Sequence, residues 1–294
     1  MRILMTTDTM GGIWSYSMEL ARSMRAFGTE FALMTMGDEL SGDQREEANR
    51  LPNVALYETK FRLEWMDDPW RDVDAAGDRL LEIESQFVPD LVHINGFAHG
   101  SLPWKAPVLV VAHSCVSSWW QAVHGESAPA RYQGYVKRVT AGLMAAKTVV
   151  APTRAMLSSL QEHYGFTGEG RVIFNGRHSL GFSPGIKSGF VLGAGRVWDA
   201  AKNFAILDRV APQLNWPVFI AGDSMPPNGE ARNFPNLHSL GRLPFERLAG
   251  HLGSASIYAL PALYEPFGLS VLEAALSGCA LVLGDIPSLR ELWD

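Results

Sequence analysis

Short apolar runs alternate along the chain with longer stretches in which apolar residues recur at helical spacing. In the first half these runs predict seven strands, at residues 2–5, 30–36, 54–58, 91–94, 108–112, 148–151 and 172–174. Residues 15–27 and 72–87 carry apolar stripes that are typical of amphipathic helices. This alternation is typical of a parallel sheet that is covered by helices on both faces.

The same rhythm restarts in the second half, where apolar runs predict strands at residues 190–193, 218–221, 237–239, 256–259 and 280–283. Before the restart, residues 175–189 are rich in glycine, proline and serine, which is typical of a linker. We therefore predict two α/β domains of the Rossmann type, residues 1–184 and 185–294. Such sheets bind ligands beyond the carboxyl ends of their strands, so two facing sheets would form a cleft that carries the chemistry.

Composition narrows the class of protein. Hydrophobic residues make up 47% of the 294 residues, enough for the cores of two domains. The 31 acidic residues outnumber the 25 basic ones, and no basic stripe suited to nucleic acid is present. Cys115 and Cys279 lie far apart without metal-ligand spacing, which favours a reduced, cytoplasmic protein. No apolar stretch approaches the ~20 residues of a spanning helix, so we expect a soluble protein, with contact to a membrane surface left open.

Two glycine-containing loops follow predicted strands. Gly11 and Gly12 come after the first strand, where backbone N–H groups could approach an anion, although a simple tight turn is the alternative. The loop after residues 190–193 contains Arg196 and Lys202 beside a helix start, two cations suited to a diphosphate. Their alternative is a solvated pair. Trp198 stands where a dinucleotide fingerprint needs its third glycine, so a nicotinamide site is disfavoured.

Glu265 and Glu273 lie on either side of an apolar segment near the end of the chain. Residues 268–277 predict a helix, so Glu265 precedes this helix and Glu273 lies within it. Carboxylates accept hydrogen bonds from neighbouring hydroxyls, and the helix start offers donors for phosphate. Two ordinary glutamates at a helix start are the alternative.

Other side chains suited to chemistry occur in the first half. His113 directly follows the run 108–112, and it is either a site residue or a core histidine. Trp119 and Trp120 follow closely, and they either stack on a sugar or pack in the interior. The Asp72–Asp74 pair imitates a metal-binding Asp-x-Asp motif, but it lies in a predicted acidic helix, and we expect a solvated face.

Together these motifs resemble a known family. Glu265 and Glu273, with Pro-Phe-Gly-Leu between them, are similar to the donor-site signature of retaining GT-B glycosyltransferases of family 4, also described as glycosyl transferases group 1. Gly11-Gly12, Asn175-Gly176, Gly195-Arg196 and Ala221-Gly222-Asp223 follow in the family's order. The resemblance implies the α/β GT-B fold, with two Rossmann-like domains facing a cleft. It also implies hexosyl transfer with retention, from a UDP- or GDP-linked sugar to an acceptor hydroxyl, with no metal or other cofactor.

The resemblance also implies roles for single residues. Arg196 and Lys202 match the positions that bind the donor phosphates, and Glu273 matches the position that binds the ribose. The catalytic positions match His113, near the reacting sugar, and Glu265, on the sugar hydroxyls. The remaining donor-binding positions match backbone groups of Gly12, Phe267, Gly268 and Leu269.

The sequence departs from the family near its end. Family members usually continue for several tens of residues beyond the position of Asp294, adding a strand and a helix that crosses back to the first domain. Either the chain is a fragment or truncated product, or the missing elements are supplied by self-association or by another polypeptide. We expect an incomplete second domain that is completed by a homo-oligomer or by a partner chain. The alternatives to transfer are a GT-B-like sugar-nucleotide epimerase and a degenerate donor-binding or scaffold protein.

Overall fold

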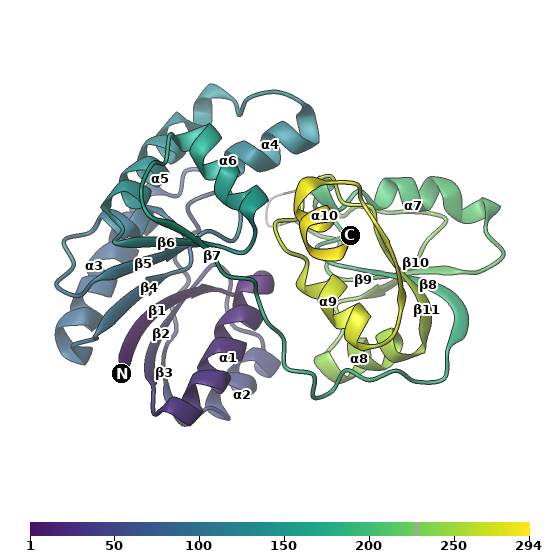
Figure 1. Cartoon of the computed structure of the whole chain (residues 1–294), viewed down its shortest axis with the longest axis horizontal. Helices are drawn as coiled ribbons and strands as arrows, with labels where there is room; N and C mark the ends of the chain where they lie inside the picture. The colour runs from purple at the N-terminus through teal and green to yellow at the C-terminus, as the bar shows by residue number, and fades with distance from the viewer. Residues whose placement is uncertain (227–228) are drawn as a thin grey trace. The chain divides into compact units, whose positions relative to one another are not determined.

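Two parallel β-sheets organise the chain in a computed structural model that describes residues 1–226 and 229–294 (Figure 1). Contacts divide the chain into two units, each built around one sheet. Unit 1 comprises residues 1–118 and 127–176, and unit 2 comprises residues 119–126 and 177–294. Residues 173–187, all of them described, form neither helix nor strand. Both the change of unit after Gly176 and the predicted boundary at residue 184 lie within that segment.

The sheet of unit 1 has seven parallel strands in the order β3-β2-β1-β4-β5-β6-β7. The strands are β1 (Arg2–Asp8), β2 (Glu30–Met36), β3 (Val54–Tyr57), β4 (Leu91–Ile94), β5 (Val108–Val111), β6 (Thr148–Ala151) and β7 (Gly170–Val172). The helices are α1 (Gly12–Met24), α2 (Gly42–Asn49), α3 (Trp70–Phe87), α4 (Val116–His124), α5 (Gln133–Ala145) and α6 (Arg154–Tyr164). Residues 119–124 of α4 are grouped with unit 2.

Alternation along β1 separates two cores. Leu4 packs in one apolar cluster with residues of α3, α5 and α6, whereas its neighbour Met5 packs in another with residues of α1 and α2. Successive side chains of a strand point to opposite faces, so this sheet is covered on both sides. Both side chains are completely buried, and each such burial contributes roughly 1.5–3 kcal/mol.

Unit 2 has a sheet of five parallel strands in the part of the chain that is described, in the order β10-β9-β8-β11-β12. The strands are β8 (Ser188–Ala194), β9 (Val218–Ala221), β10 (His238–Gly241), β11 (Ala255–Leu260) and β12 (Ala280–Leu283). The helices are α7 (Phe204–Val210), α8 (Phe245–Ser254), α9 (Leu269–Leu276) and α10 (Pro287–Trp293). One apolar cluster, with Phe204, Tyr258 and Val271 among its most buried members, fills this unit.

Strand order reverses once in each sheet. In unit 1 the reversal lies between β1 and β4, and in unit 2 it lies between β8 and β11. Ligands of doubly wound sheets bind at such switch points, beyond the carboxyl ends of the two strands. The loops at these switch points are residues 9–12 and 95–97 in unit 1, and residues 195–202 and 261–268 in unit 2.

Three predicted helices differ slightly from those observed. The predicted helix at 72–87 begins two residues earlier, at Trp70. The predicted helix at 15–27 begins earlier, at Gly12, and its α-helical part ends at Met24, followed by a 3₁₀ turn that Gly28 ends with a left-handed φ of 65°. The predicted helix at 268–277 spans Leu269–Leu276. Among the described residues, no helix has both the length and the apolar character needed to cross a membrane.

Candidate functional site

A close ion pair bridges the switch point of unit 2. Lys202 Nζ lies 2.5 Å from Glu265 Oε2, and the two side chains are 14% and 13% exposed. Lys202 ends the 3₁₀ helix that follows β8, and Glu265 lies in the loop that follows β11. The Leu263 N–H donates to the Ala201 carbonyl at 2.8 Å, so the two loops are also joined through their backbones. The structure thus brings together two residues that the sequence predicted for the site.

Arg196 is held beside this pair by a residue that the sequence reading missed. Its Nη2 donates to Asp199 Oδ2 at 2.9 Å, and Asp199 is 4% exposed. Asp199 Oδ1 accepts hydrogen bonds from the Ala201 N–H and from Trp119 Nε1, at 3.0 and 2.9 Å. An acidic residue three positions after Arg196 was the available signal, because that spacing suits an ion pair within one turn.

Nearby charges outweigh burial in setting the protonation state of Asp199. Burial by itself would raise the pKa of this carboxyl, but Arg196, Lys202 and the two donated hydrogen bonds outweigh burial and lower the pKa. Asp199 is therefore a carboxylate at neutral pH. It orients Arg196, whose side chain stays 37% exposed and open to a ligand.

The start of α9 is fixed against the loop after β8. Gly268 precedes the helix with a left-handed φ of 86°, a conformation that glycine adopts without strain. The buried Tyr258 hydroxyl donates to the Ala194 carbonyl at 3.1 Å and lies 2.7 Å from Ser270 Oγ in the first turn of α9. The first N–H groups of a helix have no partner within it. The backbone of Phe267, Gly268 and Leu269 is thereby placed at the same switch point as Lys202 and Glu265.

Glu273, further along α9, forms a second ion pair. Arg177 Nε lies 2.9 Å from Glu273 Oε1, and the two side chains are 11% and 10% exposed. The sequence placed Arg177 only within the linker, since nothing local indicates a partner so distant in the chain. Both residues belong to unit 2.

In unit 1, His113 belongs to a polar cluster centred on Asn95. Asn95 Nδ2 donates to the Thr6 carbonyl at 2.7 Å, which leaves its Oδ1 facing His113 Nε2 at 2.9 Å and His93 Nε2 at 3.0 Å. Because this oxygen only accepts, both rings donate a proton from Nε2. The Tyr16 ring packs edge-on against His113, with centroids 4.6 Å apart.

Both histidines of this cluster are neutral. Burial lowers the pKa of His113 to about 3, with a further contribution from His93. Burial likewise lowers the pKa of His93 to about 4, against the opposing hydrogen bond to Asn95. His113 therefore acts as a neutral ring in this position. The sequence marks His93 only as part of a strand, because its neighbours on β4 are apolar.

Two further features line the same edge of unit 1. Gly12 begins α1 directly after the loop that follows β1, so its backbone lies at the switch point as predicted from its place in the sequence. The Glu64 carboxylate accepts hydrogen bonds from the Phe97 and Ala98 N–H groups after β4, at 3.1 and 2.8 Å. Burial raises the pKa of Glu64 against these two hydrogen bonds. No motif marks Glu64 in the sequence.

The remaining candidates lie elsewhere. Asp74 is exposed and pairs with Arg138, and Asp72 accepts from the Arg62 N–H at 2.9 Å, so this pair lies on a solvated face. In the described part of the chain, no group of three or more His, Cys, Asp or Glu side chains is placed to hold a metal ion. Cys115 and Cys279 are both buried thiols.

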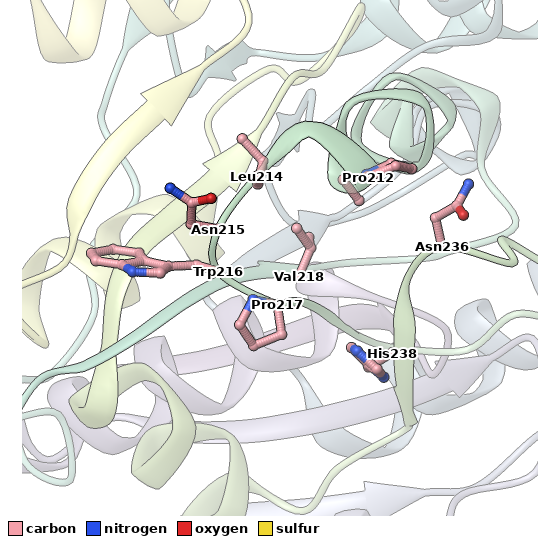
Figure 2. A pocket seen from close by; sticks show the side chains of 9 residues that line it. Pro212, Leu214, Asn215, Trp216, Pro217, Val218, Asn236 and His238 are labelled. Carbon is pink, nitrogen blue, oxygen red and sulfur yellow. The ribbon is translucent and has the colours of Figure 1, made fainter.

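A shallow hollow in unit 2 lies at the wrong edge of the sheet for a donor site. Figure 2 shows Trp216, Pro217 and Val218 around it, together with His238. Trp216 and Pro217 precede β9, and His238 begins β10. The hollow is therefore at the amino ends of these strands, whereas Lys202 follows the carboxyl end of β8.

Comparison with known proteins agrees with this geometry. Residues 10–178 match the family model described as Glycosyltransferase Family 4, and residues 189–294 match the model described as Glycosyl transferases group 1. No curated protein matches the sequence significantly.

Solved structures share the fold at low sequence identity. Sucrose-phosphate synthase from Thermosynechococcus elongatus superposes with a TM-score of 0.78 at 16% identity, over 98% of this chain and 82% of that one. A glycosyltransferase from Rickettsia africae ESF-5 superposes with a TM-score of 0.69 at 15% identity, over 100% of this chain and 82% of that one. WaaG, a glycosyltransferase involved in lipopolysaccharide biosynthesis, superposes with a TM-score of 0.65 at 16% identity, over 96% of this chain and 80% of that one.

These similarities establish the fold as GT-B, with one parallel sheet in each of two domains. The first family model alone covers more than half of the chain. The chain therefore belongs to glycosyltransferase family 4, and it is a glycosyltransferase enzyme.

Proposed function

We propose that this enzyme transfers a hexosyl group from a nucleoside diphosphate sugar to an acceptor hydroxyl, with retention of configuration and without a metal ion. The observation that carries the proposal is the Lys202–Glu265 ion pair, with Arg196 beside it, at the switch point of unit 2. This position, next to the start of α9, suits the diphosphate of a donor.

The charges of the site match the chemistry of the leaving group. When the bond to the sugar breaks, negative charge builds up on the departing diphosphate. Lys202 and Arg196 supply fixed positive charge there, and the N–H groups at the start of α9 add partial positive charge. Protein cations in these positions support a reaction that needs no metal.

The carboxylates suit the rest of the donor. Glu265 is neutralised by Lys202 through one oxygen, and a carboxylate has further lone pairs with which to accept hydrogen bonds from sugar hydroxyls. Glu273, within α9, would receive the ribose hydroxyls. Retention is supported by the similarity of the segment from Glu265 to Glu273 to the signature of retaining enzymes.

Donor binding is the direct test. Calorimetry with UDP, GDP and ADP should show binding of at least one nucleotide, and the affinity should fall about tenfold or more in Arg196→Ala and in Glu273→Ala. Arg171→Ala is the matched control, because Arg171 forms an exposed ion pair with Glu169 in unit 1. Unchanged affinity in both site variants would contradict the assignment.

Transfer itself needs a second measurement. We expect a donor that binds to be consumed in the presence of an acceptor and excess EDTA, with the anomeric configuration of the product matching that of the donor by NMR. Loss of all turnover in EDTA, restored by a divalent cation, would contradict the metal-free proposal. Conversion of the nucleotide sugar without any acceptor would instead indicate an epimerase.

A further inference from the structure

Arg177 is held in a defined orientation before any ligand binds. Its guanidinium lies over the Phe182 ring at 5.3 Å and over the Phe245 ring at 5.5 Å. These two rings meet edge-on, with centroids 5.2 Å apart. A planar guanidinium stacked on aromatic rings keeps little freedom to rotate. The aromatic contacts therefore fix the direction in which Arg177 meets Glu273.

Arg177 supplies a positive charge beside Glu273. The Glu273 side chain is 10% exposed and its Oε1 lies 2.9 Å from Arg177 Nε. A carboxylate removed from water in this way tends to take up a proton or turn toward solvent when its counter-charge is lost. Arg177 thus places a positive charge against one oxygen of the Glu273 carboxylate.

An oriented carboxylate is what a pair of neighbouring hydroxyls requires. A carboxylate can accept hydrogen bonds from two vicinal hydroxyls only if its plane faces them. A 2′-deoxyribose lacks one of these hydroxyls and would leave part of that hydrogen-bonding capacity unused.

We propose that Arg177 is the positioning residue that aims Glu273 at the ribose, and that it thereby sets the enzyme's preference for ribonucleotide donors over 2′-deoxyribonucleotide donors. The inference rests on the proposed role of Glu273 in donor binding. Arg177 acts through Glu273 and does not itself contact the reacting atoms.

The test compares UDP with dUDP, and GDP with dGDP, by calorimetry on the full chain. The wild type should bind the ribonucleotide about tenfold more tightly than its deoxy counterpart. Arg177→Met keeps an unbranched side chain over the two rings but removes the charge, so ribonucleotide affinity should fall about tenfold while deoxynucleotide affinity changes little. Arg177→Lys restores the charge and should recover part of the preference.

Two further variants separate positioning from folding. If Arg177 acts through Glu273, then Arg177→Met combined with Glu273→Gln should discriminate no less than Glu273→Gln alone. Phe245→Leu leaves the ion pair in place but removes one stacked ring, and it should lower the preference by a smaller factor. This variant tests the same idea should Arg177→Met fail to fold.

The outcomes distinguish this inference from the proposed function. Intact nucleotide binding with unchanged discrimination in Arg177→Met overturns the inference and leaves the proposed function standing. An equal loss of affinity for both nucleotides in that variant assigns Arg177 a structural role only. This result would also overturn the inference. A wild type that binds no nucleoside diphosphate overturns the proposed function and the inference together.

Discussion

Lys202 Nζ lies 2.5 Å from Glu265 Oε2, and the pair joins two loops across the point where the strand order of the second sheet reverses. Each partner alone would place an uncompensated charge in a largely enclosed position. The pairing offsets the cost of enclosing each charge, and Arg196 beside them is the more exposed cation. The site is therefore organised before a donor arrives, and a diphosphate would meet cations that are already in place.

Removal of the lysine charge should lower both catalysis and folding stability. In Lys202→Met we expect kcat/KM to fall by about 100-fold or more, because one preorganised donor at a developing negative charge contributes on that order. The free energy of unfolding should fall by about 1–3 kcal/mol as Glu265, which is 13% exposed, loses its hydrogen-bond partner. Steady-state kinetics and urea unfolding measure the two effects.

The matched control is Lys60→Met. Lys60 pairs with Glu39 on the surface, where both side chains are about two-thirds exposed. Such pairs contribute about 0–1 kcal/mol, so both stability and kcat/KM should stay close to those of the wild type. Equal effects of the two substitutions on kcat/KM would show that Lys202 does not act in the site.

Asp199→Asn should release Arg196 without disturbing the backbone. The asparagine carbonyl can still accept from the Ala201 N–H, but the charge facing Arg196 is gone. We expect nucleoside diphosphate affinity to fall about threefold to tenfold, with most of the loss in the entropy of binding, because a mobile guanidinium must be ordered on binding. Asp285→Asn, which breaks the exposed pair with Arg290, should leave affinity unchanged.

The pH dependence of the Asp199 effect follows from its lowered pKa. Its ionic contribution to stability is present above the unfolded value of about 3.9 and is lost as the pH falls through the folded pKa. The difference in unfolding free energy between the wild type and Asp199→Asn should therefore be constant from pH 6 to 8. A difference that changes within that range would contradict the assignment of a permanent carboxylate.

Local patterns were sufficient to predict the sheets, and the reason is physical. Residues 30–36, 91–94 and 148–151 are strands with the predicted bounds, because a buried parallel strand reads as a continuous apolar run. The alternation of such runs with helices also restricts the topology to doubly wound sheets. The switch point then places Lys202 and Glu265 near each other although they are 63 residues apart.

The partners of the site residues were less predictable. Arg177 lies in a loop rich in small residues, and its pairing with Glu273 depends on how that loop runs along unit 2. His93 alternates with buried apolar residues of β4, so its sequence context is that of a core position. Asn95, whose Oδ1 lies within hydrogen-bond distance of both histidines, is in the loop after β4. Contacts of this kind are made by tertiary packing, for which a single sequence carries no periodic signal.

Gly222→Ala should destabilise unit 2 at a position where backbones meet. Gly222 has a φ of 137°, and an added Cβ would lie 1.7 Å from the Gly195 carbonyl oxygen in the loop that leads to Arg196. Neither atom can move away without displacing a strand end, so we expect a loss of about 3 kcal/mol or more. Urea unfolding should show this loss, together with weaker nucleotide binding.

Gly250→Ala provides the opposite outcome in the same unit. Gly250 lies inside α8, and nothing would lie within 4 Å of an added Cβ. Alanine is favoured over glycine in a helix by roughly 0.5–1 kcal/mol, so this variant should be slightly more stable than the wild type. If both substitutions changed the free energy of unfolding in the same direction, the close approach of the two loops would not explain the effect of Gly222→Ala.

The neutral histidines of unit 1 should make the enzyme sensitive to mild acid. An unfolded histidine has a pKa of about 6.5, whereas His113 and His93 have pKa values of about 3 and about 4 in the folded chain. Between these values the unfolded chain binds protons that the folded chain does not, so stability falls as the pH falls below 6.5, by roughly 1.4 kcal/mol per pH unit for each histidine.

The variant His113→Gln tests this expectation. Its side-chain N–H can still donate to Asn95 Oδ1 but does not titrate, so the fall in unfolding free energy from pH 6.5 to 5 should be smaller by about 2 kcal/mol. His178→Gln, at an exposed position, is the control and should follow the wild-type curve. Parallel curves for the wild type and His113→Gln would show that His113 is protonated in the folded chain, and would overturn the neutral cluster around Asn95.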